Sequence, residues 1–149
     1  MHTYGSFNSA FVLLVALLFE PVALNSQNPA ACLLYEPSVV QLRGTIIRKT
    51  FPGPPNYESV ERGDKPEVYW LLVLSEPICV EQDSKDPDLN PAQGDVRRIQ
   101  LVFLDAKAYQ TDKELVGKKV IASGTLFGEH TGHHHTPVLL TVKTLKKAD

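Results

Sequence analysis

The last third of the chain, residues 115–145, constrains the fold more than any other stretch. Residues 120–127 and 138–145 are both rich in apolar and β-branched side chains, which favour strands. Between them lies a polar connection that contains Thr131-Gly132, and a glycine adopts the positive φ of a tight reversal without strain. The pattern predicts two antiparallel strands joined by a hairpin.

Three further strands are predicted earlier in the chain, at residues 39–48, 68–74 and 97–104. The first alternates between apolar and polar side chains with a glycine, Gly44, at a bend or bulge. The second is apolar enough to be covered on both sides over part of its length, and Pro77 is expected to end it.

One helix is predicted at residues 106–115, with Asp105 as its cap and Gly117 at its C-terminal stop. The order is therefore three strands, one helix and two strands. Short strands need closure or a partner sheet to bury their faces and protect their edges. We predict a mainly β fold, a small five-stranded OB-like barrel with one helix between strands 3 and 4. A small β-sandwich is the alternative, but it leaves the helix without a packing partner.

The N-terminal region predicts export. Residues 10–19 are an uninterrupted apolar run, too short to span a bilayer as a helix and placed where a signal peptide has its hydrophobic part. We expect a signal peptide over 1–26, with cleavage between 26 and 31, and a single domain over 32–149. A short buried helix is the alternative. The mature protein is expected to be periplasmic or extracellular and not an integral membrane protein.

The two cysteines, Cys32 and Cys79, both lie in the mature part. In an exported protein a disulfide between such a pair is the default interpretation. Residues 28–32 also resemble a lipoprotein cleavage site, but a proline stands where leucine is usual, and twelve residues separate the hydrophobic run from Cys32. Lipid anchoring through Cys32 is therefore disfavoured.

The charge balance argues against nucleic acid as a partner. The chain has 15 basic and 17 acidic residues, and the predicted signal peptide removes only Glu20, which leaves a net charge of −1. Nucleic-acid binding by an OB barrel needs a basic groove with exposed aromatic side chains. We expect a small ligand or an envelope protein as the partner instead.

The polar connection carries four of the five histidines, His130, His133, His134 and His135. Neutral imidazole is a common ligand for Zn²⁺ and Cu²⁺. A two-residue turn brings His130, His133 and His135 to one side as three metal ligands, whereas a three-residue turn pairs His130 with His134. The apolar pattern favours the odd-length turn, because Leu126 and Val138 then face inward together. The alternative is a polar turn whose histidines bond to backbone or solvent.

In an OB barrel, the loops between strands 1 and 2 and between strands 4 and 5 flank the ligand-binding face. In this chain they are 51–67 and 130–137. We therefore predict that Phe51, Tyr57 and His134 contact a ligand. The alternative is that Phe51 and Tyr57 only pack the long first loop onto the barrel.

Several segments spread over most of the mature chain resemble a bacterial exported family, the one catalogued as domain of unknown function 4431. They are CLLYEP (32–37), GTI (44–46), FPGPPNYES (51–59), YWLL (69–72), PICV (77–80), GTLF (124–127) and HTGHHHTPV (130–138). The resemblance implies a location in the cell envelope and implies no activity.

No nucleophile motif, phosphate-binding glycine loop or dinucleotide fingerprint is present in the sequence. We therefore expect a non-enzymatic binding module of the cell envelope. One alternative is a metal-dependent hydrolase with a three-histidine site and bound water. The other is a structural adaptor that binds another envelope protein through a free strand edge.

Overall fold

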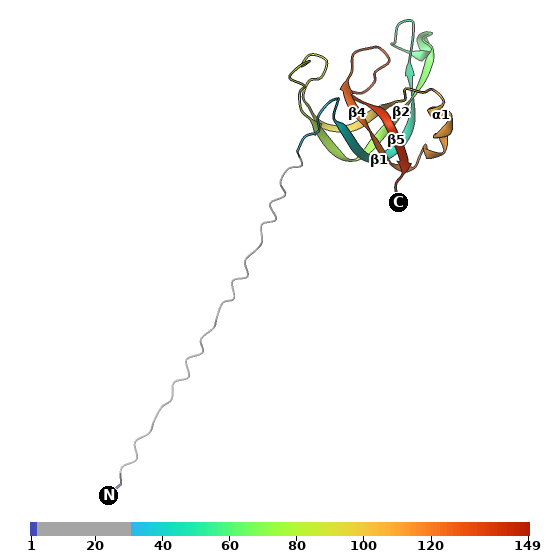
Figure 1. The fold of residues 1–149 in the computed structure, drawn as a ribbon. Coiled ribbons are helices and arrows are strands. Elements are labelled where there is room, and N and C mark those ends of the chain that lie inside the picture. The colour runs from blue at the N-terminus through green and yellow to red at the C-terminus, as the bar shows by residue number, and fades with distance from the viewer. Residues whose placement is uncertain (3–30) are drawn as a thin grey trace.

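The structure is a computed structural model that describes residues 1–2 and 31–149. Its five strands are β1 (Val39–Pro52), β2 (Pro66–Val80), β3 (Gln93–Val102), β4 (Lys119–Gly128) and β5 (Val138–Lys147). They close into a barrel in the order β1-β2-β3-β5-β4 (Figure 1). All neighbours are antiparallel except β3 and β5, which are parallel. The predicted mainly β, five-stranded barrel is confirmed. The apolar run of the predicted signal peptide and the expected cleavage positions 26–30 lie outside the described residues.

Side chains alternate between the two faces of each strand, and the apolar side chains on the inner face fill the barrel interior. Gly44 stands where β1 changes partner, since it pairs with Leu74 of β2 and with Val120 of β4. A Cβ there would collide with the carbonyl group of Val73, so only glycine fits the predicted bend. The buried inward side chains include Val40, Leu42, Ile46, Trp70, Leu72, Ile99, Leu101, Val120, Ala122, Leu126, Val138 and Leu140.

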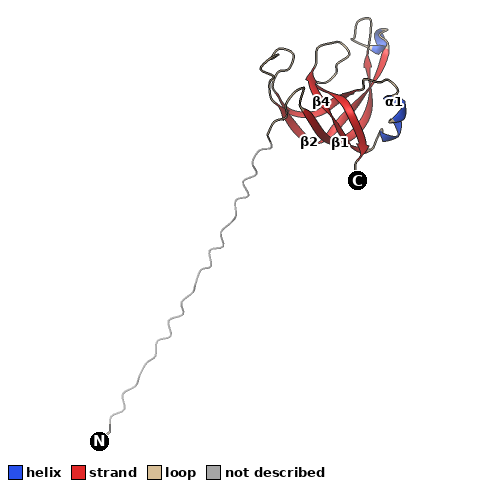
Figure 2. Ribbon diagram, in the orientation of Figure 1, coloured by secondary structure: helices blue, strands red, loops and turns tan. Residues whose placement is uncertain are grey.

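Helix α1 (Ala108–Thr111) lies between β3 and β4 as predicted, but it is shorter than expected. Asp112 leaves helical geometry, with φ −97° and ψ 7°, and the chain continues as the 3₁₀ helix η2 (Lys113–Leu115). The aromatic rings of Trp70, Phe103 and Tyr109 contact one another edge-on, with centroids 4.7–5.6 Å apart, and hold α1 against the barrel. Figure 2 shows α1 beside the strands of the barrel. Within the described residues, no helix is long and apolar enough to cross a membrane.

The strands β1 and β2 extend beyond their predicted ends. Pro77 does not end β2, because it falls in a shift of register between Val73 and Ile78, where a missing N–H breaks no ladder bond. Strand β3 also begins earlier than predicted, at Gln93 instead of residue 97. The longer β1 and β2 carry the first loop away from the barrel, and that loop holds a further 3₁₀ helix, η1 (Val60–Arg62).

The N-terminal segment is fixed to the end of β2 by the predicted disulfide, which is confirmed. Cys32 and Cys79 are bonded with their Cα atoms 4.7 Å apart. Next to it, Leu33 pairs with Val80, and the Leu33 N–H donates to the Cys79 carbonyl at 2.8 Å. The bond closes a long loop, with a sequence separation of 47. On the chain-entropy model such a loop contributes roughly 4 kcal/mol to stability.

Candidate functional site

The candidate site lies on the outer face of β1, β2 and β3, between loops 53–65 and 129–137. Ladder neighbours on this face include Phe51 with Glu67, Lys49 with Tyr69, and Leu71 with Gln100. Leu71 and Gln100 alternate with core residues and so point away from the barrel interior, yet each is only 2% exposed. They are covered because loop 129–137 folds over this face. We call this surface the loop face.

Gln100 fixes the second half of loop 129–137. Its side-chain Nε2 donates to the His133 carbonyl at 2.9 Å, and its Oε1 accepts from the His135 N–H at 2.8 Å. The Gln100 N–H also donates to Oγ1 of buried Thr136, whose hydroxyl donates to the Val138 carbonyl. A buried amide with both ends satisfied positions its partners firmly. Residues 133–136 are therefore held to β3.

Loop 53–65 has its own buried organiser, Asp64, which is 4% exposed. Its carboxylate accepts from the backbone N–H groups of Asn56, Glu58 and Ser59 at 2.8–2.9 Å, and these bonds lower the pKa of Asp64. Within this turn Tyr57 has a φ of 59°, an uncommon conformation for a residue other than glycine. The turn places the Tyr57 ring beside Gly132, where an added Cβ would lie 3.3 Å from the ring.

His133 joins the two loops. Its Nδ1 lies 3.0 Å from Oε2 of Glu67, and its Nε2 lies 3.3 Å from the Tyr57 hydroxyl. A carboxylate only accepts, so Nδ1 donates to Glu67, and in the tautomer with its proton on Nδ1 the ring accepts from the Tyr57 hydroxyl at Nε2. The Tyr69 hydroxyl donates to the same carboxylate at 2.6 Å. We call Tyr57, Glu67, Tyr69 and His133 the His133 cluster.

The hydrogen bonds of the His133 cluster shift the pKa values of its members. The Tyr69 hydroxyl is the main cause of a lowered Glu67 pKa, and His133 adds to it. Burial first, and then the bonded carboxylate, raises the pKa of Tyr69 above its ordinary value. Both shifts favour an ionised Glu67 beside a neutral Tyr69, which is the state that makes these hydrogen bonds.

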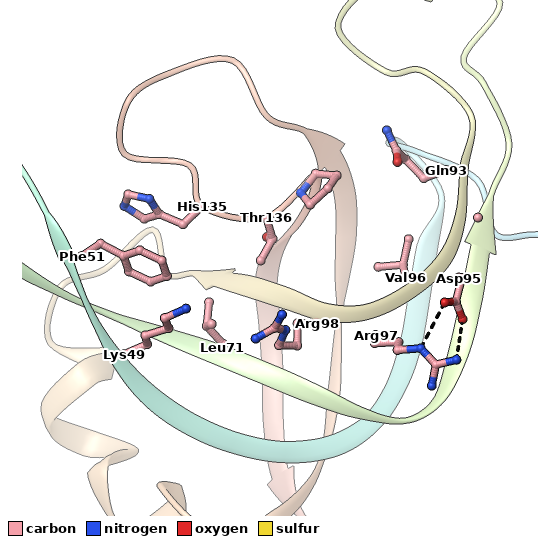
Figure 3. A pocket seen from close by; sticks show the side chains of 12 residues that line it. Lys49, Phe51, Leu71, Gln93, Asp95, Val96, Arg97, Arg98, His135 and Thr136 are labelled. Atoms are coloured by element: carbon pink, nitrogen blue, oxygen red, sulfur yellow. Dashed lines mark hydrogen bonds and ion pairs between the residues drawn. The ribbon is translucent and has the colours of Figure 1, made fainter. Parts of the chain in front are cut away.

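His135 lies flat on the ring of Phe51, with centroids 3.9 Å apart and an angle of 3° between the planes. The edge of Tyr69 completes the contact, with a centroid distance of 4.7 Å. Burial lowers the pKa of His135, and its Nε2 is buried with no hydrogen-bond partner among the residues that the structure describes. On the other side of the Phe51 ring lies Lys49, whose Nζ is 4.8 Å from the ring centroid (Figure 3).

A cavity of about 310 Å³ opens beside this stack. Figure 3 shows it running along β3 from the end marked by Phe51 and His135 to the end marked by Gln93. Two backbone segments, 93–98 and 135–137, line it together with side chains of β1 and β2. The complete lining is Lys49, Phe51, Leu71, Gln93, Gly94, Asp95, Val96, Arg97, Arg98, His135, Thr136 and Pro137.

The other two histidines form a separate pair. Nδ1 of His134 accepts from the backbone N–H of His130 at 3.1 Å, and the two rings are 4.6 Å apart. Nδ1 of His130 lies 3.1 Å from the Gly128 carbonyl, and the ring of Phe127 contacts both imidazoles. Burial lowers the pKa of His134, and the neighbouring His130 adds to the effect.

Both predicted hairpin registers are wrong. The strands β4 and β5 pair only as far as Gly128 with Val138, so residues 129–137 form a longer loop instead of a two- or three-residue turn. The physical reason is that 133–136 bond to Gln100 of β3 instead of continuing the ladder with β4. Leu126 and Val138 are nevertheless both fully buried, as the apolar pattern predicted.

The predicted site residues are therefore divided between two places. Phe51 and Tyr57 lie on the loop face with His133 and His135, while His134 lies with His130 beside Phe127. The three expected metal ligands His130, His133 and His135 do not converge. Across residues 1–2 and 31–149, no group of three or more His, Cys, Asp or Glu side chains is placed to hold a metal ion. Binding of Zn²⁺ or Cu²⁺ stays a prediction.

Sequence reasoning did not single out Glu67, Tyr69, Gln100, Lys49 or Arg98. A signal existed for two of them. Tyr69 alternates with Trp70, so one of the two had to face outward, and Gln100 is a polar residue between apolar neighbours. The convergence of the others depends on the pairing of strands distant in sequence.

A comparison with protein-family models matches residues 98–146 to a family described as domain of unknown function (DUF4431). The matched residues begin within β3, include Gln100 and the whole of loop 129–137, and end within β5. No curated protein matches the sequence.

Proposed function

We propose that this protein, whose residues 98–146 match the family described as domain of unknown function 4431, is a non-enzymatic binding module of the cell envelope. Its ligand occupies the loop face. The observation that carries this proposal is the cavity of about 310 Å³ beside the His133 cluster, which links loops 53–65 and 129–137. Phe51 and His135 form one wall of that cavity.

The geometry supports binding because the loop face is organised before a ligand arrives. Gln100 holds one loop, Asp64 holds the other, and His133 joins them. Ordering loops on binding costs affinity, and preorganisation removes that cost. The cavity volume is at the lower end of the range of about 300–1,000 Å³ for small-ligand sites. A compact ligand or one group of a larger ligand fits this size.

The location in the envelope rests on three observations. The disulfide between Cys32 and Cys79 is the kind of bond that persists in oxidising compartments. The apolar run at residues 10–19 and the resemblance to an exported family agree with it. Fractionation of cells that express the full chain tests this part: a processed, disulfide-bonded protein outside the cytoplasm is expected, and an unprocessed cytoplasmic protein contradicts it.

The structural-adaptor alternative draws on one edge of the barrel. Strand β3 pairs with β5 only from Gln100 to Val102. Among the described residues, the part of β3 from Gln93 to Ile99 therefore pairs with β2 on one edge and has no strand partner on the other. An unpaired edge can receive an added strand from a partner. This edge borders the same cavity, so both functions would use one surface.

A fragment screen followed by ¹H–¹⁵N NMR on the oxidised chain tests the binding function. We expect fragments to perturb amides at 49–51, 67–71, 93–98 and 133–137. The shallow hollow lined by Gln41, Arg43 and Glu76 serves as an internal control surface. Fragments that gather there, or that bind nowhere, contradict the proposal.

A matched pair of variants sharpens this test. His133→Ala removes the contact between the loops and should weaken binding of fragments at the loop face. His130→Ala removes a histidine from the same loop on the side away from the cavity and should leave binding unchanged. Equal effects of the two variants would argue against a binding role for the His133 cluster.

A further inference from the structure

The cavity on the loop face carries a local charge opposite to that of the whole protein. The chain has a formal net charge of −2, yet three cationic side chains and one carboxylate line this cavity. The carboxylate, Asp95, is engaged by Arg97 through contacts of 2.8 and 3.1 Å. This leaves the charges of Lys49 and Arg98 to face the cavity.

Lys49 and Arg98 reach the cavity from different strands. On the ladder, Lys49 stands opposite Tyr69 and Arg98 stands opposite Val73, so their Cα atoms lie on either side of Leu71. Figure 3 shows both long side chains beside Leu71. Among the described residues neither one forms an ion pair. Two like charges beside the apolar side chain of Leu71 repel each other, and together they raise the local concentration of an anion.

The rest of the lining favours a carboxylate with an apolar part. Leu71, Val96 and Pro137 give the cavity an apolar wall beside the two cations. The planar fork of an arginine matches the two oxygens of a carboxylate, and such charge-assisted bonds are among the strongest in proteins. Burial lowers the pKa of His135, so this ring adds stacking surface rather than a third charge at neutral pH.

We propose that the cavity binds the carboxylate of a ligand between Lys49 and Arg98, with an apolar part of the ligand against Val96 and Pro137. The proposal rests on the proposed binding function and names its ligand class. Two sources share this chemistry, a free small organic acid and the C-terminal carboxylate of a peptide. The peptide source would also use the unpaired edge of β3 from Gln93 to Ile99.

The first experiment compares three probes of one shape by NMR titration at pH 7.5: 3-phenylpropionate, its neutral amide and the corresponding amine, 3-phenylpropylamine. The acid should bind about tenfold more tightly than the amide, as one good charge-assisted contact provides, and the amine should not bind. Raising NaCl from 50 to 500 mM should weaken binding of the acid several-fold and leave binding of the amide unchanged. N-acetylphenylalanine distinguishes the two sources: tighter binding than 3-phenylpropionate favours a peptide end, and equal or weaker binding favours a free acid.

Charge-removing variants locate the effect. Arg98→Gln and Lys49→Gln should each remove most of the preference for the acid over the amide. Arg48→Gln is the matched control, because Arg48 lines a different hollow, with Trp70 and Tyr109, on the α1 side of the barrel. Thermal unfolding of each variant, expected to be unchanged, shows that the fold is intact. If one variant is destabilised, the other still tests the site.

The outcomes separate this inference from the function on which it rests. If the acid and the amide bind the loop face equally, or if Arg98→Gln and Lys49→Gln keep the preference, the carboxylate site is wrong and the binding face stands. Tighter binding of inorganic phosphate than of 3-phenylpropionate also overturns the ligand class. If no fragment of any charge binds the loop face, both proposals fail.

Discussion

Loop 129–137 contains two pairs of histidines that differ sharply in what they contact. His130 and His134 bond to each other and to the backbone within the loop and its approach, beside the ring of Phe127. His133 and His135 contact side chains of the first loop and of β1 and β2, more than sixty residues away in sequence. Each pair also has a phenylalanine partner.

The difference shows that residue type does not assign a role within this loop. His130 and His134 satisfy local groups and therefore maintain the shape of the loop. His133 and His135 attach the loop to the barrel face and border the cavity. A substitution of His130 or His134 should affect stability alone, whereas a substitution of His133 or His135 should also affect binding. The following predictions test that separation, beginning with the largest expected effect.

Gln100→Ala should destabilise the protein most. The change removes both side-chain bonds that hold 133–135 to β3 and leaves the His133 carbonyl and the His135 N–H without their partner. Losing partners of this kind costs about 2–3 kcal/mol in total, since the loop can recover part of the loss from water. Urea unfolding with a constant m-value measures it.

The same variant should act on one side of the loop only. NMR signals of His133 and His135 should shift and broaden, while those of His130 and His134, whose bonds are local, should stay close to wild type. If all four histidines respond alike, the loop is one unit and the division into two pairs is wrong.

Phe51→Ala and Phe127→Ala compare the two aromatic partners directly. Each ring is partly buried and contacts one histidine pair, so each change should cost about 1–2 kcal/mol, less than for a fully buried phenylalanine. Only Phe51→Ala should also weaken the binding of 3-phenylpropionate, because Phe51 lines the cavity. Thermal unfolding and NMR titration give the two readouts. Weakened binding in Phe127→Ala to the same degree would break the comparison.

The barrel was predictable from the sequence because its signals are local. Apolar residues two apart mark the inward face of each strand, Gly44 marks the bend, and the single helical segment fixes the order of elements. The disulfide followed from the cysteine count. Pro77 misled the prediction of β2, because the shift of register that accommodates proline is a property of the pair β2–β3 and not of either strand alone.

The site was predictable only in outline. Phe51, Tyr57 and the histidine loop were expected on one face because an OB-like barrel brings these two loops together. The division of the histidines could not be predicted, since it depends on Gln100 drawing 133–136 toward β3. A hairpin pattern considers only β4 and β5 and contains no information about a third strand. The cations of the cavity were missed for the same reason.

The pH dependence of stability should reveal the two histidines with lowered pKa values, one from each pair. His134 and His135 resist protonation in the folded state, mainly because they are partly buried. In the unfolded chain these histidines bind protons as the pH falls below their ordinary pKa of 6.5, whereas in the folded state they bind them only at lower pH. Their contribution to stability is therefore complete above pH 6.5 and is lost as the pH falls through the folded pKa values.

His134→Gln and His135→Gln should therefore each flatten the loss of stability between pH 7.5 and 5, an effect smaller than that of either phenylalanine change. This window lies above the titration of Glu67, whose pKa is lowered from 4.5. Unfolding midpoints across the window provide the measurement. A steeper loss of stability in either variant would contradict the sign.

Tyr57→Phe should have the smallest effect and gives the sharpest test of the contact between the loops. The change removes only the hydroxyl that lies 3.3 Å from Nε2 of His133, a long and exposed bond. A loss of about 0.5 kcal/mol is expected, the low end for a single hydrogen bond. In a double-mutant cycle with His133→Ala the effect should disappear, because the partner is already gone. In the matched cycle with His130→Ala the two losses should add, since His130 lies on the other side of the loop. Additive losses in both cycles would mean that Tyr57 and His133 are neighbours without a bond, and His133 would then attach its loop only to Glu67 and Tyr69 of β2.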